Sequence, residues 1–305
     1  MELRQLQYFL ACAKAGSFSE AAKTLYSTQS NVSKAVKGLE DSLGLRLFER
    51  MPRGIRVTVQ GERVYQYACK ILNEVQALEQ ISGEESASWL RISFNPSSWF
   101  ANQFVEFYKK QKDRNYRYQI YTAGTRTVLE RVRDYLDDVG FLYVRGRDKD
   151  EFYYELERNR LNFTMLCRAE EKLYPGRGSF LYGRKPTEGG ISEEDLKKCR
   201  FIQNDQDDFS GAGKGGDSVR DSLNLAVLTN SDYIMEKMLK ETDVANISGS
   251  YLSGSGASRE LPLALPEREV LFGYVQRKGD QPDTGIREFI QFLEEKLLFR
   301  NESDV

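Results

Sequence analysis

Residues 27–44 read STQSNVSKAVKGLEDSLG, and this stretch indicates the fold of the N-terminal part of the chain. Four apolar side chains recur at the spacing of one helix face and can be buried together: Val32, Val36, Leu39 and Leu43. The opposite face offers only small polar and basic side chains: Gln29, Ser30, Ser33, Lys34 and Lys37. A solvated helix face usually pairs Glu with Lys, so this face is suited to lie against a grooved, negatively charged surface.

The residues before this helix complete a helix-turn-helix. An apolar face in residues 3–13 predicts a first helix, which Gly16 ends. The segment Ser17-Phe18-Ser19-Glu20 has the spacing of a capping box and predicts the start of a second helix. Thr28 is expected to cap the third helix and Gly44 to end it. Two short helices joined by a tight turn, the second with a polar face, predict a DNA-binding motif.

A basic hairpin is predicted directly after this motif, in residues 45–61, LRLFERMPRGIRVTVQG. Pro52 and Gly54 break the chain between two short β-like runs, and three arginines crowd the turn: Arg50, Arg53 and Arg56. Residues 1–61 carry nine Lys or Arg against five acidic residues, whereas the whole chain has a net charge of −2. This favours a wing that contacts a phosphate backbone or a minor groove, although a solvated hairpin with incidental charge would have the same composition.

A long helix is predicted from Thr58 to about Ser82. Its apolar residues step by four, three, four and three, which is a heptad seam: Val64, Ala68, Ile71, Val75 and Leu78. Self-pairing of two chains along this seam is the favoured interpretation. The alternative is that the seam packs against the chain's own C-terminal domain.

Beyond a short polar linker at 82–88, strand and helix patterns alternate. Strands are expected at 90–94, 116–121, 139–144, 161–167, 224–229, 244–248 and 269–275. Helices are expected near 99–112, 127–136, 193–198, 231–241 and 284–298. Alternation predicts an α/β fold with a mainly parallel sheet, here two units joined by crossing strands, and such folds bind ligands at the carboxyl ends of strands.

Two predicted helix starts lie just past strand ends. Ser97 and Ser98 follow the first strand, and Thr125 follows the second. Hydroxyls and free amides there can bind an anion, and Trp99 beside them could supply an apolar wall. Ordinary helix capping needs the same residues, so both interpretations stay open.

Composition weighs against several classes of protein. The chain has no histidine, which removes Ser-His-Asp and Cys-His catalysis and histidine-based metal centres. Its four cysteines are scattered and form no Cys-x-x-Cys pair. We therefore expect no enzyme, no metal site and no cofactor. The apolar runs are strand-sized and no signal peptide is evident, so a cytoplasmic protein without a membrane contact is expected.

The segment GSFSEAAKTLYSTQSNVSKAVKGLEDSLGLRLFER (16–50), followed by Arg53, Thr58 and Gly61, resembles the LysR-type transcriptional regulators over residues 3–65. The α/β remainder is similar in order and size to that family's inducer-binding region, a periplasmic-binding-protein-like pair of doubly wound subdomains. Matching segments are GTRTVLERV (124–132), DDVGFLYV (137–144) and VLFGYV (270–275). Ser30 stands where the family often has proline.

The resemblance implies a winged helix-turn-helix at 1–58, a dimerisation helix and hinge at 59–88, and an effector domain at 89–305. Within that domain, one subdomain would comprise 89–160 and 268–305, and the other 161–267. The implied partners are an operator in double-stranded DNA, RNA polymerase, and further copies of the chain in a homodimer or homotetramer. A small-molecule effector, which could be an anion, is also implied. Implied effector contacts are Ser97, Ser98 and Thr125 from one subdomain, and Gln203, Asn204 and Asn230 from the other. The alternative is a small-molecule-binding protein or enzyme whose N-terminal head serves only assembly.

Overall fold

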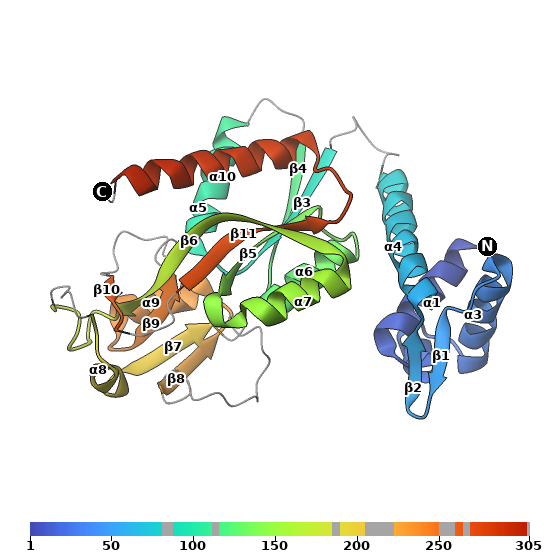
Figure 1. Ribbon diagram of the computed structural model, residues 1–305, viewed down its shortest axis with the longest axis horizontal. Coiled ribbons are helices and arrows are strands. Elements are labelled where there is room, and N and C mark those ends of the chain that lie inside the picture. Colours follow the sequence, from blue (N-terminus) through green and yellow to red (C-terminus); the bar gives the residue numbers. More distant parts are fainter. Residues whose placement is uncertain are drawn as a thin grey trace. The chain divides into compact units, whose positions relative to one another are not determined.

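The computed structural model describes residues 1–80, 88–111, 116–184, 190–204, 223–249, 260–264 and 269–303. Contacts divide the chain into two compact units, which are Met1–Ser86 with Asp134–Leu136, and Ala87–Arg133 with Asp137–Val305 (Figure 1). The hinge predicted around 82–88 falls almost wholly outside the described residues, since only its last residue is described. No described helix combines the length and the apolar character that crossing a bilayer requires.

The first unit is a winged helix-turn-helix followed by a long helix. Its elements are α1 (Leu3–Ala15), α2 (Phe18–Thr24), α3 (Gln29–Leu43), β1 (Phe48–Met51), β2 (Gly54–Val57) and α4 (Val59–Gln80). Gly16 and Gly44 are left-handed, with φ of 62° and 65°, and end α1 and α3 as predicted. Thr28 caps α3 as predicted, because its hydroxyl accepts the Asn31 amide at 3.2 Å.

The capping box predicted at the start of α2 is wrong. Ser17 occupies the N-cap position, but its side chain makes no cap hydrogen bond, and only its carbonyl accepts the Ala21 amide at 3.0 Å. The reciprocal arrangement is found instead at the start of α1, between Glu2 and Gln5. Spacing alone therefore selected the wrong helix for this motif.

Hydrogen bonds to the preceding helices hold the wing in place. One carboxylate oxygen of Glu40, on α3, accepts the amides of Leu47 at 2.7 Å and Phe48 at 3.3 Å. The Ile55 amide donates to the Gly16 carbonyl at 2.9 Å. Gly54 has a φ of 113° at the turn of the wing, where any larger residue would also meet the Gly16 backbone. The hairpin is thus fixed to the ends of α1 and α3.

The second unit is built on one mixed sheet of parallel and antiparallel pairs, whereas the sequence predicts a mainly parallel one. Its strands are β3 (Ser88–Phe94), β4 (Tyr116–Thr122), β5 (Val139–Arg145), β6 (Leu161–Pro175), β7 (Arg200–Asn204), β8 (Asn224–Thr229), β9 (Ala245–Gly249), β10 (Leu261–Pro262) and β11 (Glu269–Arg277). Its helices are α5 (Ser98–Lys110), α6 (Thr125–Arg133), the 3-10 turn η1 (Gly146–Asp148), α7 (Lys149–Asn159), α8 (Glu193–Lys197), α9 (Asp232–Glu241) and α10 (Thr284–Ser303).

The sheet contains two halves of equivalent topology. Its order is β4-β3-β5-β11-β6-β9-β7-β8, with β10 paired to β6. In each half a central strand, β3 or β7, has parallel neighbours on both sides. Residues 161–170 of β6 pair with β11, and Glu171–Pro175 pair with β9, so β6 passes from one half to the other. The second half therefore begins ten residues later than the subdomain boundary placed at 161.

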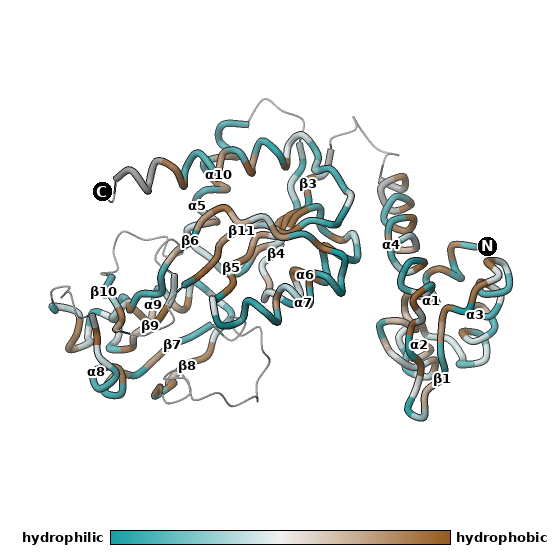
Figure 2. Tube along the Cα trace, in the orientation of Figure 1, coloured by the Kyte–Doolittle hydropathy of each residue, from teal (hydrophilic) through white to brown (hydrophobic). Residues whose placement is uncertain are grey.

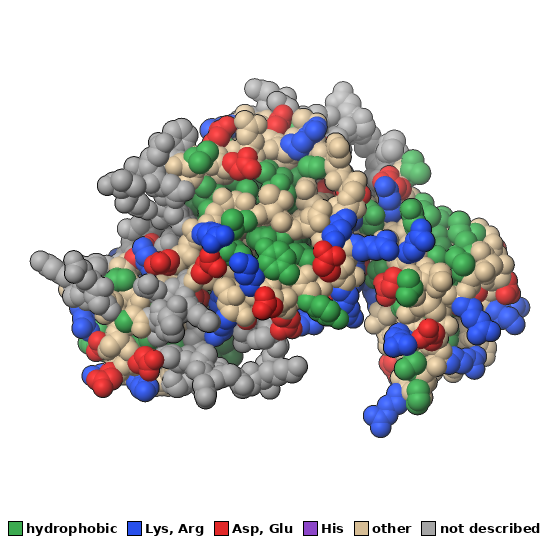
Figure 3. Space-filling view, viewed as in Figure 1, with side chains coloured by type: hydrophobic (Ala, Val, Ile, Leu, Met, Phe, Trp, Pro, Cys, Tyr) green, Lys and Arg blue, Asp and Glu red, His purple; other side chains and the backbone are tan. Residues whose placement is uncertain are grey.

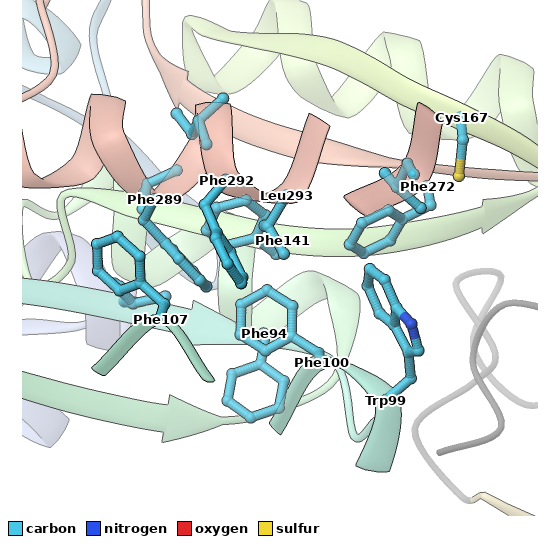
Figure 4. Packing of buried hydrophobic residues seen from close by; sticks show 14 of the residues in the cluster. Phe94, Trp99, Phe100, Phe107, Phe141, Cys167, Phe272, Phe289, Phe292 and Leu293 are labelled. Atoms are coloured by element: carbon cyan, nitrogen blue, oxygen red, sulfur yellow. The ribbon is translucent and has the colours of Figure 1, made fainter. Parts of the chain in front are cut away.

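Aromatic side chains fill the core on one face of the first half. Phe100 and Phe107 of α5 and Phe289 of α10 pack on Phe141 of β5, with ring centroids of Phe107 and Phe289 4.9 Å apart (Figure 4). Helices α6 and α7 cover the other face around Val128, Leu142 and Phe152. The strands are apolar where helices cover them, and the loops and outer helix faces are hydrophilic (Figure 2).

Candidate nucleic-acid interface

Helix α3 buries one face and exposes the other as its sequence predicts, except that Leu43, expected on the buried face, is 36% exposed. Val32, Val36 and Leu39 are at most 2% exposed and lie in the core with Phe9 and Leu47. The predicted binding face points outward: Gln29, Ser30, Lys34 and Lys37 are exposed, and Ser33 is half-buried. The apolar face fixes the rotation of the helix about its axis, so the polar face is held outward as a unit.

The cations of this surface differ in whether they are paired. Within the described residues, Lys34, Lys37, Arg50 and Arg53 make no ion pair. Figure 3 shows Lys and Arg side chains along α3 and at the tip of the wing. Arg56, which was grouped with the other wing arginines, instead binds Glu49 on the neighbouring strand, with Nη2 2.7 Å from Oε2. Unpaired cations leave their full charge available to phosphate.

A groove runs between α3 and the wing. Its lining combines Ser33, Val36 and Lys37 from α3 with Glu49 and Arg50 from β1. Arg46, in the connection between them, also lines the groove. Three carboxylates line the groove as well: Glu40, Asp41 and Glu49. The outward polar face of α3 can meet base edges, while the cations of the groove can contact a phosphate backbone.

Tyr8 ties α1 to the turn before α3. Arg4 donates to the Tyr8 hydroxyl at 2.8 Å and 3.1 Å, and its guanidinium lies 5.2 Å from the ring centroid. Hydrogen bonds, from Ser27 first and then from Arg4, lower the pKa of Tyr8. Because Ser27 precedes the N-cap of α3, these contacts help to set where the helix begins. The sequence offered no pattern that would have singled out this group.

In the α/β unit, the predicted polar residues do lie at strand ends. Ser97 caps α5 after β3, accepting the Phe100 amide at 3.2 Å. Thr125 begins α6 after β4 and donates to Asn95 Oδ1 at 3.4 Å. The same Asn95 donates to the Ala123 carbonyl at 3.1 Å and accepts the Tyr143 amide at 3.0 Å. Asn95, which is 3% exposed, thus joins the ends of β3, β4 and β5.

The second half of the sheet presents a similar polar strand end. Gln203 and Asn204 close β7, and Asn230 follows β8 and is exposed. Asn246 of β9 donates to the Ile202 carbonyl at 2.9 Å and to Gln203 Oε1 at 3.4 Å. The nitrogen of the Gln203 amide is buried without a hydrogen-bond partner in the described residues. A buried donor of this kind is suited to a ligand acceptor.

One contact brings the two strand ends together. The Ser98 hydroxyl donates to Asp232 Oδ2 at 3.4 Å, which joins the first turn of α5 to the first turn of α9. Ser98 belongs to the half around β3 and Asp232 to the half around β7. The predicted groups of both halves therefore lie at one end of the unit.

Comparison with known proteins agrees with this geometry. Residues 3–62 match the family model of the bacterial regulatory helix-turn-helix proteins of the lysR family. The match covers α1 to the start of α4, which is the winged helix-turn-helix of the first unit.

Two curated proteins that the chain resembles are named as HTH-type transcriptional regulators. The chain is 34% identical over 147 residues to the HTH-type transcriptional regulator BenM of Acinetobacter baylyi, covering 46% of this chain and 47% of that protein. It is 47% identical over 72 residues to the regulator BudR of Klebsiella aerogenes, covering 24% and 50%. The chain thus matches about half the length of these two relatives.

A solved structure has a similar fold. Full-length OxyR C199D from Pseudomonas aeruginosa has a TM-score of 0.53, with 16% identity over 96% of this chain and 98% of that one. At that identity the likeness concerns fold alone. It covers the helix-turn-helix and the α/β unit in one chain.

Trp99 and part of the predicted seam of α4 lie in the packed cores. Trp99 is 7% exposed and packs edge-on against Phe272 at 5.6 Å, so it belongs to the aromatic core (Figure 4). Of the predicted α4 seam, Ala68 is 1% exposed in the core of the first unit, and Val64 and Ile71 pack against that core. Val75 is half-buried and Leu78 is 64% exposed.

Sequence patterns do not single out several residues at these sites. Asn95, Asp232 and Asn246 were missed because each depends on which strand ends meet. Glu49 was missed because its role appears only in the register of the wing. The described residues contain no group of three or more Cys, Asp or Glu arranged to hold a metal ion. All four cysteines are buried and free, and burial raises the pKa of Cys12 to about 12 and that of Cys199 to about 11.

Proposed function

We propose that this protein is a sequence-specific DNA-binding transcriptional regulator, and not an enzyme, which acts in the cytoplasm. The observation that carries the proposal is the outward face of α3, with Gln29, Lys34 and Lys37 exposed beside a wing whose Arg50 and Arg53 are unpaired in the described structure. In this role α3 lies in the major groove, where Gln29 can bind the N6 and N7 atoms of adenine. Ser30, Ser33 and Lys34 reach neighbouring bases or phosphates.

The wing and Lys37 supply attraction that does not depend on sequence. Arg50 and Arg53 contact phosphates or the minor groove, and Lys37 and Arg46 hold the backbone along the groove between α3 and β1. The named relatives are HTH-type transcriptional regulators, which supports the same role for this chain.

We further propose that a small polar molecule binds where the strand ends of the α/β unit meet. Ser98 and Asn204 mark the two halves of that site, and the unpartnered amide nitrogen of Gln203 supplies a donor. A ligand that prefers one arrangement of the two halves would shift their equilibrium and so alter DNA binding. Two copies pair through α4, with Leu78 exposed for such a contact, and pairs can join into tetramers.

The DNA-binding proposal is tested by fluorescence anisotropy with the full chain and labelled duplexes. One duplex comes from the DNA upstream of the protein's own gene, and the other has the same composition in scrambled order. We expect binding of both at low salt, a steep loss of affinity as salt rises, and a preference for the first duplex. Absence of binding to any duplex at low ionic strength would remove the proposal.

A further inference from the structure

The wing carries a single carboxylate, and this carboxylate is already paired with an arginine. Residues 45–61 contain four arginines and only one acidic residue, Glu49. In the hairpin register Glu49 stands directly opposite Arg56, and the two side chains meet at 2.7 Å. Both are largely exposed, Glu49 at 52% and Arg56 at 67% of their side chains. No fold constraint requires a charged pair here, because neither side chain belongs to the core.

This pair divides the wing into two kinds of cation. Arg50 and Arg53 have no ion-pair partner in the described residues, whereas Arg56 does. Glu49 and Arg50 line the groove beside α3, but no residue of β2, where Arg56 lies, belongs to that lining. Two other carboxylates of the lining belong to α3 and not to the wing: Glu40, which accepts two backbone amides, and Asp41.

The geometry points to Glu49 as the residue that limits how strongly the wing holds DNA of any sequence, by pairing Arg56 and withholding its charge from phosphate. The inference rests on the proposed function, because it requires the wing to lie on DNA. Glu49 is a positioning residue that acts through Arg56.

An exposed ion pair is held weakly, so phosphate competes with Glu49 for Arg56. If Arg56 leaves, however, the bare carboxylate of Glu49 stands in the groove that receives the phosphates and repels them. In either arrangement, therefore, the Glu49–Arg56 pair adds no net positive charge to the surface that meets phosphate. Of the wing arginines, only Arg50 and Arg53 then add to the sequence-independent attraction, and α3 contributes a larger share of the total binding energy. Limiting non-specific attraction in this way favours discrimination between sequences.

The test compares Glu49→Gln, Arg56→Gln and the double variant in the full-length protein. Affinity for a random-sequence duplex is measured by anisotropy between 50 and 200 mM salt, roughly the range over which phosphate contacts dominate. Each added phosphate contact steepens the plot of log K against log salt by about 0.9, which is about 3.5-fold in affinity over a fourfold change in salt.

We expect Glu49→Gln to steepen the salt dependence by about 0.9 and to reduce the preference for a duplex selected by the wild-type protein. Arg56→Gln, which leaves Glu49 bare, should weaken binding to both duplexes. The double variant should return to the wild-type slope. A Glu49→Gln slope equal to wild type would show that Glu49 withholds no phosphate contact and would overturn the inference. A double variant as weak as Arg56→Gln would show that Arg56 itself contacts phosphate and would overturn it as well.

Glu20→Gln is the matched control, since Glu20 pairs with Lys23 at the same 2.7 Å on α2 and is similarly exposed. It removes the same charge from the same unit without touching the wing, so its slope should stay with wild type. Equal steepening by Glu20→Gln would attribute the effect to net charge and overturn the role of Glu49. If wild-type protein binds no duplex, the proposed function fails; if it binds and Arg53→Ala weakens it while Glu49→Gln changes nothing, only the present inference fails.

Discussion

The hydroxyl of Ser98 donates a hydrogen bond to Oδ2 of Asp232, and so joins helices that belong to opposite halves of one sheet. Each residue lies in the first turn of its helix, α5 or α9, directly after a strand end. The oxygen atoms are 3.4 Å apart, which is long for a hydrogen bond between a hydroxyl and a carboxylate. A weak contact at this place is suited to open when the two halves move.

We expect Ser98→Ala to cost less than about 1 kcal/mol of unfolding free energy, because a long hydrogen bond contributes little. Asp232→Ala should cost about 0.3–1 kcal/mol more, because a carboxylate in the first turn also favours the helix dipole. Urea unfolding of both variants and of the double variant gives the coupling energy of the pair. A coupling well above about 1 kcal/mol would mean that the contact is a firm tie and not one suited to open.

The roles of Gln29 and Arg53 separate base recognition from phosphate attraction. Gln29→Ala should lower affinity for the preferred duplex by about 1–3 kcal/mol while leaving a scrambled duplex nearly unaffected. Arg53→Ala should weaken both duplexes similarly and reduce the salt slope by about 0.9. Titrations of each variant against both duplexes check this. If the two variants changed the two affinities in the same way, the assignment of α3 and wing would be wrong.

The sequence predicted elements best where burial is regular. The strand at 224–229 is found with the predicted bounds, and β4 differs by one residue, because short apolar runs between polar turns leave few alternatives. Helix α7 is not among the predicted helices. Only Phe152 and Leu156 are buried there, while Tyr153 and Tyr154 are exposed, so the aromatic cluster hid a helical spacing of four.

Which residues contact one another was harder to predict than which face of a helix is apolar. The apolar stripe of α4 was recognised, but its spacing does not encode which surface covers it, and Ala68 and Ile71 pack on the chain's own first unit. Arg56 was grouped with Arg50 and Arg53 because all three are basic, yet only the strand register shows that Arg56 meets Glu49. Interactions between residues adjacent in space but distant in sequence were the part that composition and periodicity could not supply.

Capping of α3 offers a stability test with its own internal control. Thr28→Ala removes the hydroxyl that accepts the Asn31 amide and should cost about 0.5–2 kcal/mol. Ser17→Ala, at the N-cap of α2, should change stability by less than about 0.5 kcal/mol, because the Ser17 side chain makes no cap hydrogen bond. Urea unfolding measures both, and Thr28→Ser should retain most of the wild-type value. Equal costs for Thr28→Ala and Ser17→Ala would contradict the capping geometry.

Two carboxylates of the α/β unit should respond to pH in opposite directions. Burial raises the pKa of Asp138 above its ordinary value of 3.8, although its Oδ2 accepts the Arg91 amide at 2.8 Å. A hydrogen bond from Lys296, at 2.6 Å, lowers the pKa of Glu106 below its ordinary value of 4.5. The first group disfavours its charged form in the folded state, and the second favours it.

The stabilising contribution of Asp138 is therefore present below about pH 3.8 and is lost as pH rises through its raised pKa. Asp138→Asn keeps an acceptor for the Arg91 amide and carries no charge. The unfolding free energy of this variant relative to wild type should therefore rise as pH increases from about 3.8 through the raised pKa of Asp138. The contribution of Glu106 is present above about pH 4.5 and is lost as pH falls through its lowered pKa. Glu106→Gln should accordingly be less stable than wild type at neutral pH, with the difference vanishing in acid. Urea unfolding of the three proteins between acid and neutral pH measures these differences, and parallel curves would show that neither carboxylate is shifted as the structure indicates.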